Sequence, residues 1–351
     1  MNEKNCERLT FEYQILHIRI VLGQKKVYKV QKNQLFEMKR NISITYQIRS
    51  EDEGERLDFV TAREFTEFSR VHIQKWIKDG SLLLDGKIVK PKQIVKTAQL
   101  ISLEILEDPV LEDEPEDIPI EILYEDEDIL VLNKQPNLVV HPGAGNQSGT
   151  LVNALLHHDK ELAFLPRAGI VHRLDKDTSG VMVVAKNEYS YLNIISQLKE
   201  RKVNRQYLAL VVGEPLSGST INEPIGRHPK HRTKQAVTDK GKEAITSFKV
   251  KEKMDGYSLL NVSLETGRTH QIRVHLAFIG FPIVGDSVYG RGKQFAPGTS
   301  EDLKKNISTF SRQALHAEQL KLVHPTSAKK VSYRAKIPDD LEQLIMLFHK
   351  S

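Results

Sequence analysis

Short apolar runs rich in β-branched residues recur through the second half of the chain, each bounded by polar or glycine-containing segments. Such runs predict β-strands, because β-branched side chains pack well on the pleated surface of a sheet. The expected strands are residues 129–131, 181–185, 207–212, 244–250 and 258–264.

Helical spacing of apolar residues appears between and after these strands. Thr150 is a suitable N-cap for one helix, and Pro338 with Asp339 opens the last one. A helix over residues 189–200 is expected to face the core with its spaced apolar residues, Leu192, Ile195 and Leu198. Strands in hairpin-like succession, interrupted by helices without regular alternation, favour an α+β fold with a mixed, largely antiparallel sheet.

The first half of the chain predicts a smaller module. A helix over residues 70–79 ends at Gly80, and three of its apolar residues share one face: Ile73, Trp76 and Ile77. Asp85-Gly86 supplies a two-residue hairpin turn shortly afterwards. Arg70 and Lys75 lie largely off the apolar face, where they could be an ordinary solvated surface or a contact for a charged partner.

Charge is distributed unevenly along the 351 residues. Residues 107–128 hold twelve acidic side chains and no lysine or arginine, so the net charge of +5 conceals a remainder with 51 basic and 34 acidic residues. Clustered bases favour polyphosphate partners. No apolar run approaches the roughly 20 residues of a membrane helix. The single cysteine, Cys6, cannot form an internal disulfide and fits a reducing cytoplasm.

Four segments are expected. Residues 1–37 are interpreted as a loose N-terminal extension, with a strand added to the next domain as the alternative. Residues 38–106 form the small module. Residues 107–120, rich in acids and prolines, are expected to be a stiff, charged linker. Residues 121–351 form the large domain.

Candidate chemistry centres on residues 169–186, where two apolar runs flank a polar segment. This pattern predicts strand, loop and strand, with Asp175 at the tip of the loop. A carboxylate on a loop held by two buried strands is well placed for chemistry, although an aspartate there could equally cap a turn.

Residues 172–175, His-Arg-Leu-Asp, followed by Thr-Ser-Gly at 178–180, resemble the signature of the RluA family of RNA pseudouridine synthases. Other segments resemble further blocks of that family in the same order: residues 138–145, 267–276, 285–290 and 314–317. Residues 50–106 resemble an S4-type RNA-binding module. The resemblance is greatest to the D type, which modifies large-subunit ribosomal RNA. It implies the pseudouridine synthase catalytic fold with a small S4-like α/β module in front.

The resemblance implies a catalytic site built by Asp175, Tyr207 and Arg273. Asp175 would act at the ribose, as a nucleophile or as a general base. Arg273 would pair with it, because an adjacent guanidinium keeps a sheltered carboxylate ionised. Tyr207 would stack on the uracil. From the residues alone, Tyr207 could be strand filler and Arg273 a surface salt bridge.

The target uridine must leave its stack to reach such a site, and the resemblance gives Arg173 the vacated space. Arg268 and the basic segment Arg227, Lys230 and Arg232 are expected to contact RNA, as are Arg70 and Lys75 of the S4-like module. The segment 227–232 is equally compatible with a merely exposed loop.

The implied reaction is isomerisation of specific uridines in 23S ribosomal RNA, in the helix 69 stem-loop, by a cofactor-free monomer in the cytoplasm. Another ribosomal or transfer RNA site is the alternative. Two distant alternatives are a non-catalytic S4 RNA-binding protein and a magnesium-dependent phosphatase, the latter suggested by Asp-Lys-Asp-Thr at 175–178. The histidines form no metal-ligand set, so no metal is expected.

Overall fold

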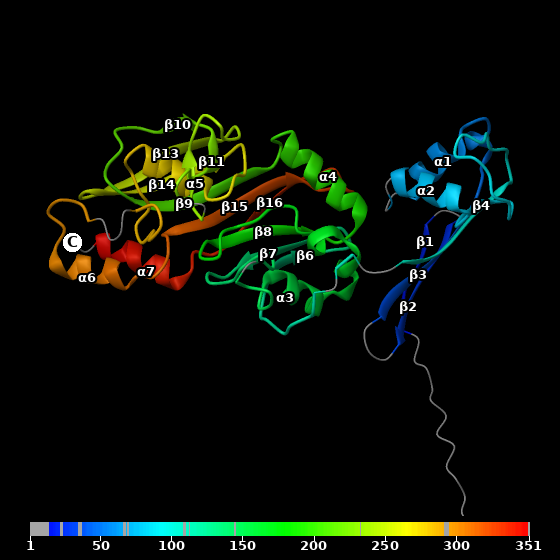
Figure 1. The fold of residues 1–351 in the computed structure, drawn as a ribbon, viewed down its shortest axis with the longest axis horizontal. Helices are drawn as coiled ribbons and strands as arrows, with labels where there is room; N and C mark the ends of the chain where they lie inside the picture. The colour runs from blue at the N-terminus through cyan, green and yellow to red at the C-terminus, as the bar shows by residue number, and fades with distance from the viewer. Residues whose placement is uncertain are drawn as a thin grey trace, which may run out of the picture. The chain divides into compact units, whose positions relative to one another are not determined.

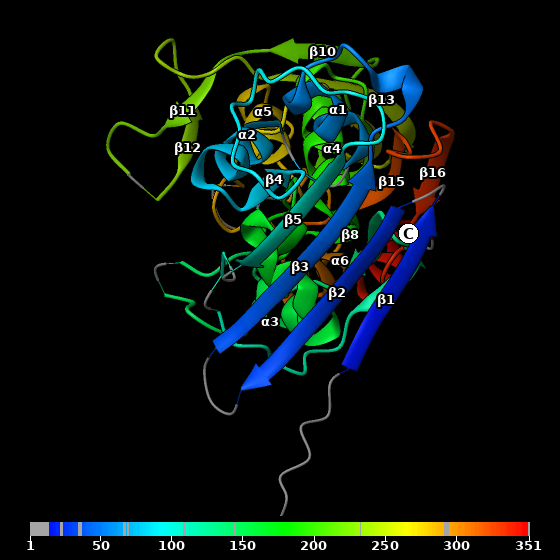
Figure 2. The same ribbon diagram turned by 90° about the vertical axis from the view of Figure 1, so that its right-hand side faces the viewer.

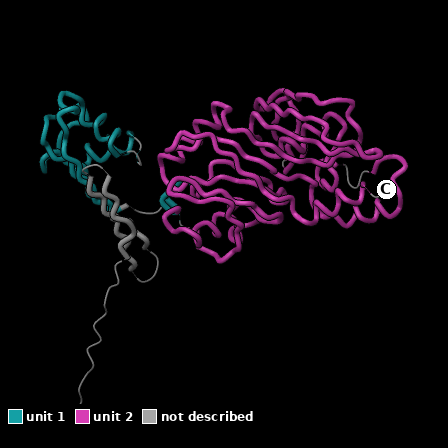
Figure 3. Tube along the Cα trace, turned by 180° about the vertical axis from the view of Figure 1, so that it is seen from behind, with its two compact units in different colours: residues 1–112, 163–166 teal, residues 113–162, 167–351 magenta. Residues whose placement is uncertain are grey.

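The computed structural model describes residues 14–21, 24–33, 37–65, 68, 70–107, 110–111, 113–143, 145–231, 233–290 and 295–349, with side chains from Ile42 onward. The chain divides into two compact units (Figure 3). The first comprises residues 1–112 and 163–166, and the second residues 113–162 and 167–351. In the described part of the chain, no helix is long and apolar enough to cross a membrane.

The first unit is an antiparallel sheet with two helices packed on it. Figure 2 shows its longer strands side by side, in the sheet order β1-β2-β3-β5-β4. The strands are β1 (Gln14–Val21), β2 (Gln24–Asn33), β3 (Glu37–Gln47), β4 (Leu82–Leu84) and β5 (Leu100–Glu107). The helices are α1 (Leu57–Glu64) and α2 (Arg70–Asp79), with a 3-10 turn at Ser50–Asp52. Ile73, Trp76 and Ile77 are buried as expected.

Part of the N-terminal segment forms strands, which was the alternative to a loose extension. Over residues 14–21 and 24–33 the backbone forms two strands, and β2 pairs with β3 along its whole length. A strand bonded on both sides satisfies its backbone polar groups, which explains why these residues extend the sheet. Cys6 and the first thirteen residues lie outside the described part of the chain.

The second unit is built on a nine-stranded sheet in which β8 and β15 form the parallel pair (Figure 1). Its strands begin with β6 (Glu121–Glu125), β7 (Ile129–Lys134), β8 (Ser179–Ala185) and β9 (Asn204–Val212). They continue with β10 (Ser219–Asn222), β13 (Ile245–Met254), β14 (Tyr257–Leu264), β15 (Leu315–Val323) and β16 (Lys330–Arg334). β11 (Ile225–Arg227) and β12 (Gln235–Val237) form a separate hairpin.

Helices cover the second unit's sheet (Figure 1). They are α3 (Leu151–His158), α4 (Glu188–Lys199), α5 (Gln271–Phe278), α6 (Glu301–Thr309) and α7 (Asp339–Phe348). Two 3-10 turns, Lys160–Phe164 and Pro166–Gly169, overlap residues 163–166 of the first unit. A capping box between Thr150 and Asn153 begins α3, and Asn153 also donates to the carbonyl of Glu114 at 2.7 Å. The backbone amide of Glu116 also donates to the carbonyl of Asn153 at 3.0 Å, so residues 114–116 of the expected linker lie against α3.

The buried face of α4 is not the apolar one that its spacing predicted. Leu192 and Ile195 are 46% and 36% exposed, whereas Ser190, Ile194 and Gln197 are buried. Gln197 explains the difference, because its amide both donates to and accepts from the backbone of Val323 at the end of β15. Specific hydrogen bonds thus orient the helix against its hydrophobic pattern.

Candidate active site

Asp175 lies in the turn that leads into β8. The backbone amide of Thr178 donates to the carbonyl of Asp175 at 3.1 Å, and Leu174 is buried beside it. The expected strand before the loop is reduced to one bridge, between Ile170 and Val184. Gly180 has φ of +120° and its Cα lies against the carbonyl of Ala317, so a side chain there would collide with β15. The parallel pairing that fixes this loop therefore requires the glycine of the motif.

Lys134 is hydrogen-bonded to the loop that carries Asp175. The residue is only 1% exposed. Its ammonium donates to the carbonyls of Gln135 at 2.8 Å, Leu138 at 3.0 Å and Lys176 at 2.8 Å. Burial lowers the pKa of Lys134 to about 7, against the attraction of Asp177 and Asp175. The lysine thus joins the end of β7 to the residue directly after Asp175.

We expect Lys134→Met to lower the free energy of unfolding by about 2–3 kcal/mol at pH 7, because it leaves buried carbonyls without donors. The loss should grow as the pH rises from 7 toward 10. Because folding lowers the pKa of Lys134, the folded protein binds fewer protons than the unfolded chain between pH 7 and 10. The free energy of unfolding of the wild-type protein therefore rises over that range, and Lys134→Met lacks this gain. Urea denaturation at several pH values checks this. A difference in free energy of unfolding between the wild type and Lys134→Met that narrows with rising pH would contradict it.

Asp175, Arg273 and Asp286 form one charged cluster. Arg273, on α5, donates from Nη1 to Asp175 Oδ2 at 2.9 Å, and from Nε and Nη2 to Asp286 at 2.7 and 3.0 Å. Burial opposes ionisation of both Asp286 and Arg273, but their mutual bonds and charges hold the pKa of Asp286 below its usual range and raise that of Arg273. Backbone amides of Val288 and Tyr289 also donate to Asp286. The guanidinium is therefore fixed before any substrate arrives.

His270 lies beside this cluster. Its Nε2 lies 3.9 Å from Asp175 Oδ1, and its Nδ1 is 2.7 Å from the hydroxyl of Tyr289. Burial lowers the pKa of His270, although the charge of Asp175 works in the opposite direction. His270 has a left-handed backbone with φ of 57°, which is uncommon for a residue other than glycine and often marks a functional site.

Asp175 and Tyr207 line the same cleft, of about 540 Å³, together with Arg173, Arg268 and Arg273. Tyr207 lies on β9 and is 6% exposed. Burial raises the pKa of its hydroxyl, against the nearby charge of Arg205. The cleft thus brings together the three expected catalytic residues and two of the expected RNA contacts, in a space of the size that holds a small ligand.

The other expected RNA contacts lie elsewhere. Arg227 and Lys230 are exposed at the β11–β12 hairpin and do not line the cleft, and Arg232 lies outside the described residues. In the first unit, Lys75 is exposed on α2. Arg70 binds Asp58 at 2.8 Å and stacks on the half-exposed ring of Phe59, 3.9 Å from its centroid. An arginine stacked on an exposed aromatic ring offers a flat cationic surface to a base.

Sequence reasoning missed four side chains of the site: Lys134, Arg205, His270 and Asp286. Asp286 and His270 lie within segments that resemble family blocks, which was the only signal for them. Lys134 closes an apolar strand, where a lysine usually reaches solvent. Its burial depends on two carbonyls from the turn directly after it and on a third from Lys176, 42 residues later.

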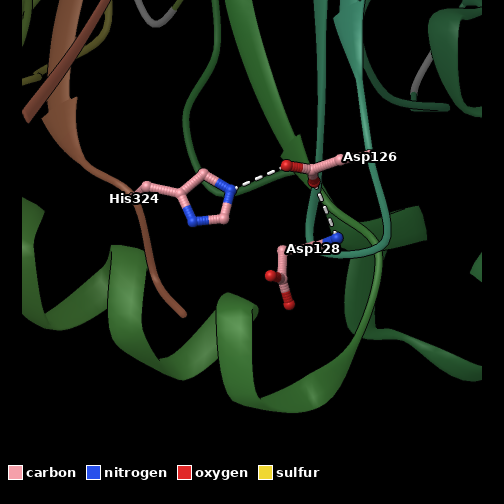
Figure 4. Close-up of side chains that lie close together, drawn as sticks. All are labelled: Asp126, Asp128 and His324. Carbon is pink, nitrogen blue, oxygen red and sulfur yellow. Dashed lines mark hydrogen bonds and ion pairs between the residues drawn. The ribbon is translucent and has the colours of Figure 1, made fainter. Parts of the chain in front are cut away.

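Asp126, Asp128 and His324 bring potential metal-ligand atoms within 4.8 Å of one another (Figure 4). His324 Nε2 lies 2.8 Å from Asp126 Oδ2, in a direct hydrogen bond, and Asp128 accepts from Asn187 and Ser190. A hydrogen bond of that length joins the two atoms to each other. The cluster connects the β6–β7 turn with the end of β15, so its hydrogen bonds give it a structural role.

Comparisons with known proteins identify a family. The family model of the RNA pseudouridylate synthases matches residues 128–278, and that of the S4 domain matches residues 55–101. A protein of Xylella fastidiosa named ribosomal large subunit pseudouridine synthase D is 49% identical over 292 residues, 83% of this chain and 88% of its own. The Escherichia coli K12 protein of that name is 44% identical over 309 residues, 88% of this chain and 95% of its own.

A solved human structure, RNA pseudouridylate synthase domain containing 4, is similar with a TM-score of 0.51 and 27% identity, over 64% of this chain and 93% of that one. These likenesses confirm the expected α+β fold and the S4 module. They also set aside the phosphatase and the non-catalytic binding protein. With nearly half of its residues shared over most of its length, the chain belongs to the RNA pseudouridylate synthase family and is an RNA pseudouridine synthase with an S4 domain.

Proposed function

We propose that this enzyme isomerises uridines of large-subunit ribosomal RNA, in the helix 69 stem-loop of the 23S molecule. The names of the relatives support ribosomal RNA as the substrate, and the S4 domain supports RNA binding beyond the cleft. The single observation that carries the assignment of the site is the bond from the buried Arg273 guanidinium to Asp175 inside a nucleotide-sized cleft.

In this proposal Asp175 acts on the ribose of the target nucleotide. The N1–C1′ bond breaks and its electron pair leaves with the uracil. The ring then rotates, C5 bonds to C1′, and the C5 proton is replaced by one at N1, so that no atom is gained or lost. If Asp175 attacks C1′, its bond to that carbon forms as N1–C1′ breaks and breaks again when C5 bonds to C1′. If it instead removes a ribose proton, it returns that proton to the sugar when C5 bonds. Both roles need an ionised carboxylate. The bond from Arg273 supports that state.

Arg173 and Tyr207 complete the proposed site. A base in a stem-loop must leave its stack to enter the cleft, at a cost of a few kcal/mol. Arg173 is exposed at the cleft beside Asp175, where its planar guanidinium can fill the vacated stack. The buried ring of Tyr207 can stack on the everted uracil. No cofactor or metal enters these steps, and we propose that a single chain acts in the cytoplasm.

Pseudouridine mapping of ribosomal and transfer RNA from a strain lacking this protein tests the substrate. We expect pseudouridine to be lost from the helix 69 stem-loop and to return when the wild-type gene is restored. Restoration with an Asp175→Asn gene is the matched control and should not return it. Loss at another ribosomal site or in transfer RNA would favour the alternative substrates, and an unchanged pseudouridine map would contradict the proposed function.

A further inference from the structure

Among the residues that the structure describes, Arg205 is a buried cation without a carboxylate partner. It lies on β9, is 7% exposed and lines the cleft. Its Nη2 donates to the carbonyl of Glu265 at 3.2 Å, and its buried Nε has no hydrogen-bond partner in the described part of the chain. Within the described ranges, no carboxylate oxygen lies within 4.0 Å of it, although the buried Arg273 has two carboxylate partners and the buried Arg312 has one.

Such an arrangement is costly unless something offsets it. A buried charge without a counterion loses its hydration, and a buried donor without an acceptor loses free energy as well. An arginine does not escape this cost by releasing its proton. The site nevertheless makes room for the group, because a side chain at Gly267 would meet Arg205 Nη1 at 2.8 Å. The structure therefore keeps an uncompensated positive charge at the wall of the cleft.

The position of this charge matches a need of the reaction. Arg205 and Tyr207 are two residues apart on one strand, so their side chains share a face of the sheet. Tyr207 is the proposed stacking partner of the uracil. When the N1–C1′ bond breaks, the uracil leaves with the electron pair, and the negative charge spreads from N1 onto the carbonyl oxygens of the ring. Fixed donors aimed at such a developing charge are the strongest single source of transition-state stabilisation in many enzymes.

We propose that Arg205 donates to a carbonyl oxygen of the everted uracil and stabilises the negative charge that the base carries while it is detached from the ribose. The inference rests on the proposed function of the cleft and extends it to the leaving group. It holds for either role of Asp175, because the electron pair departs with the uracil in both. The burial of Arg205 favours a small group at the inner end of the nucleotide over a backbone phosphate, which is larger and solvated.

The test uses the full chain and a stem-loop RNA whose mapped target carries uridine, 2-thiouridine or 4-thiouridine. Sulfur accepts hydrogen bonds more weakly than oxygen. Arg205→Met should lower kcat with the uridine RNA by roughly 10²-fold, with less than about threefold change in RNA affinity. One thio substitution should slow the wild-type enzyme yet slow Arg205→Met no further, because both changes remove the same contact.

Two other variants separate this role from a structural one. Arg205→Lys keeps the charge and should retain more activity than Arg205→Met at a similar melting temperature. Should Arg205→Met fail to fold, Arg205→Lys takes its place with the thio RNAs, and a smaller thio effect than in the wild type is then expected. Arg334→Gln removes an exposed arginine on β16, outside the cleft, and should behave as wild type.

Independent, multiplicative losses from the variant and the thio substitution would overturn the inference. So would wild-type turnover by Arg205→Met, or a wild-type enzyme indifferent to both thio substitutions. A wild-type enzyme that fails to convert the uridine RNA would instead refute the proposed function, so the two failures are distinguishable.

Discussion

Asp175→Asn should abolish pseudouridine formation while leaving RNA binding intact. The substitution keeps the shape of the side chain but removes the charge that either proposed role at the ribose requires. We expect turnover to fall by roughly 10⁴-fold or more, as is seen when the central member of a catalytic group is removed. The measurement is tritium release from RNA labelled at C5 of uridine, with affinity followed by filter binding. Release at the wild-type rate would refute the role of Asp175.

The same variant separates base flipping from chemistry. If Arg173 fills the vacated stack, Asp175→Asn should still evert the target, and a fluorescent base placed beside it should report the loss of stacking. Asp175→Asn combined with Arg173→Ala should bind RNA without that signal. Asp175→Asn combined with Lys251→Ala, which removes a lysine from the β13 strand outside the cleft, is the matched control. An equal signal in all three proteins would remove Arg173 from the flipping step.

Local patterns predicted most of the elements that carry the site. The β-branched runs over residues 181–185 and 207–212 are strands β8 and β9, and Thr150 begins α3 as its capping chemistry indicates. These strands and this helix start depend on residues that are close in sequence, so local patterns predict them. The local pattern also singled out Asp175 on its loop. The resemblance to a family gave Asp175 its role and supplied Tyr207 and Arg273, because nothing in the residues around Tyr207 distinguishes it from strand filler.

The features that sequence reasoning missed depend on long-range contacts. Lys134 is buried because a turn after β7 and the loop after Asp175 both aim carbonyls at it. Gln197 turns α4 away from its apolar face by bonding to a strand more than a hundred residues later. Arg205 stays unpaired because no carboxylate reaches that wall of the cleft among the residues described. The tertiary structure decides which buried polar groups find hydrogen-bond partners. The hydrophobic periodicity of the sequence does not predict those partners.

Arg273→Met should be the most disruptive single change for stability as well as for activity. Asp286 is only 2% exposed, so the substitution leaves a buried carboxylate without the guanidinium that donates two hydrogen bonds to it. It also removes the cation beside Asp175. Breaking a buried pair by removing one member typically costs about 3–5 kcal/mol. We expect a loss of that size at pH 7 by urea denaturation, and almost no tritium release from labelled RNA.

The pH dependence and a second substitution identify the cause. In the wild type the pKa of Asp286 is depressed, so its contribution is present above the usual carboxyl range and is lost as the pH falls through the folded value. In Arg273→Met burial should raise that pKa instead, so protonation relieves the penalty on acidification and the gap to wild type narrows below pH 7. Arg273→Met with Asp286→Asn should recover stability without activity, because the buried charge is gone while Asp175 still lacks its partner. A double variant as unstable as Arg273→Met would show that lost packing, rather than an orphaned charge, sets the cost.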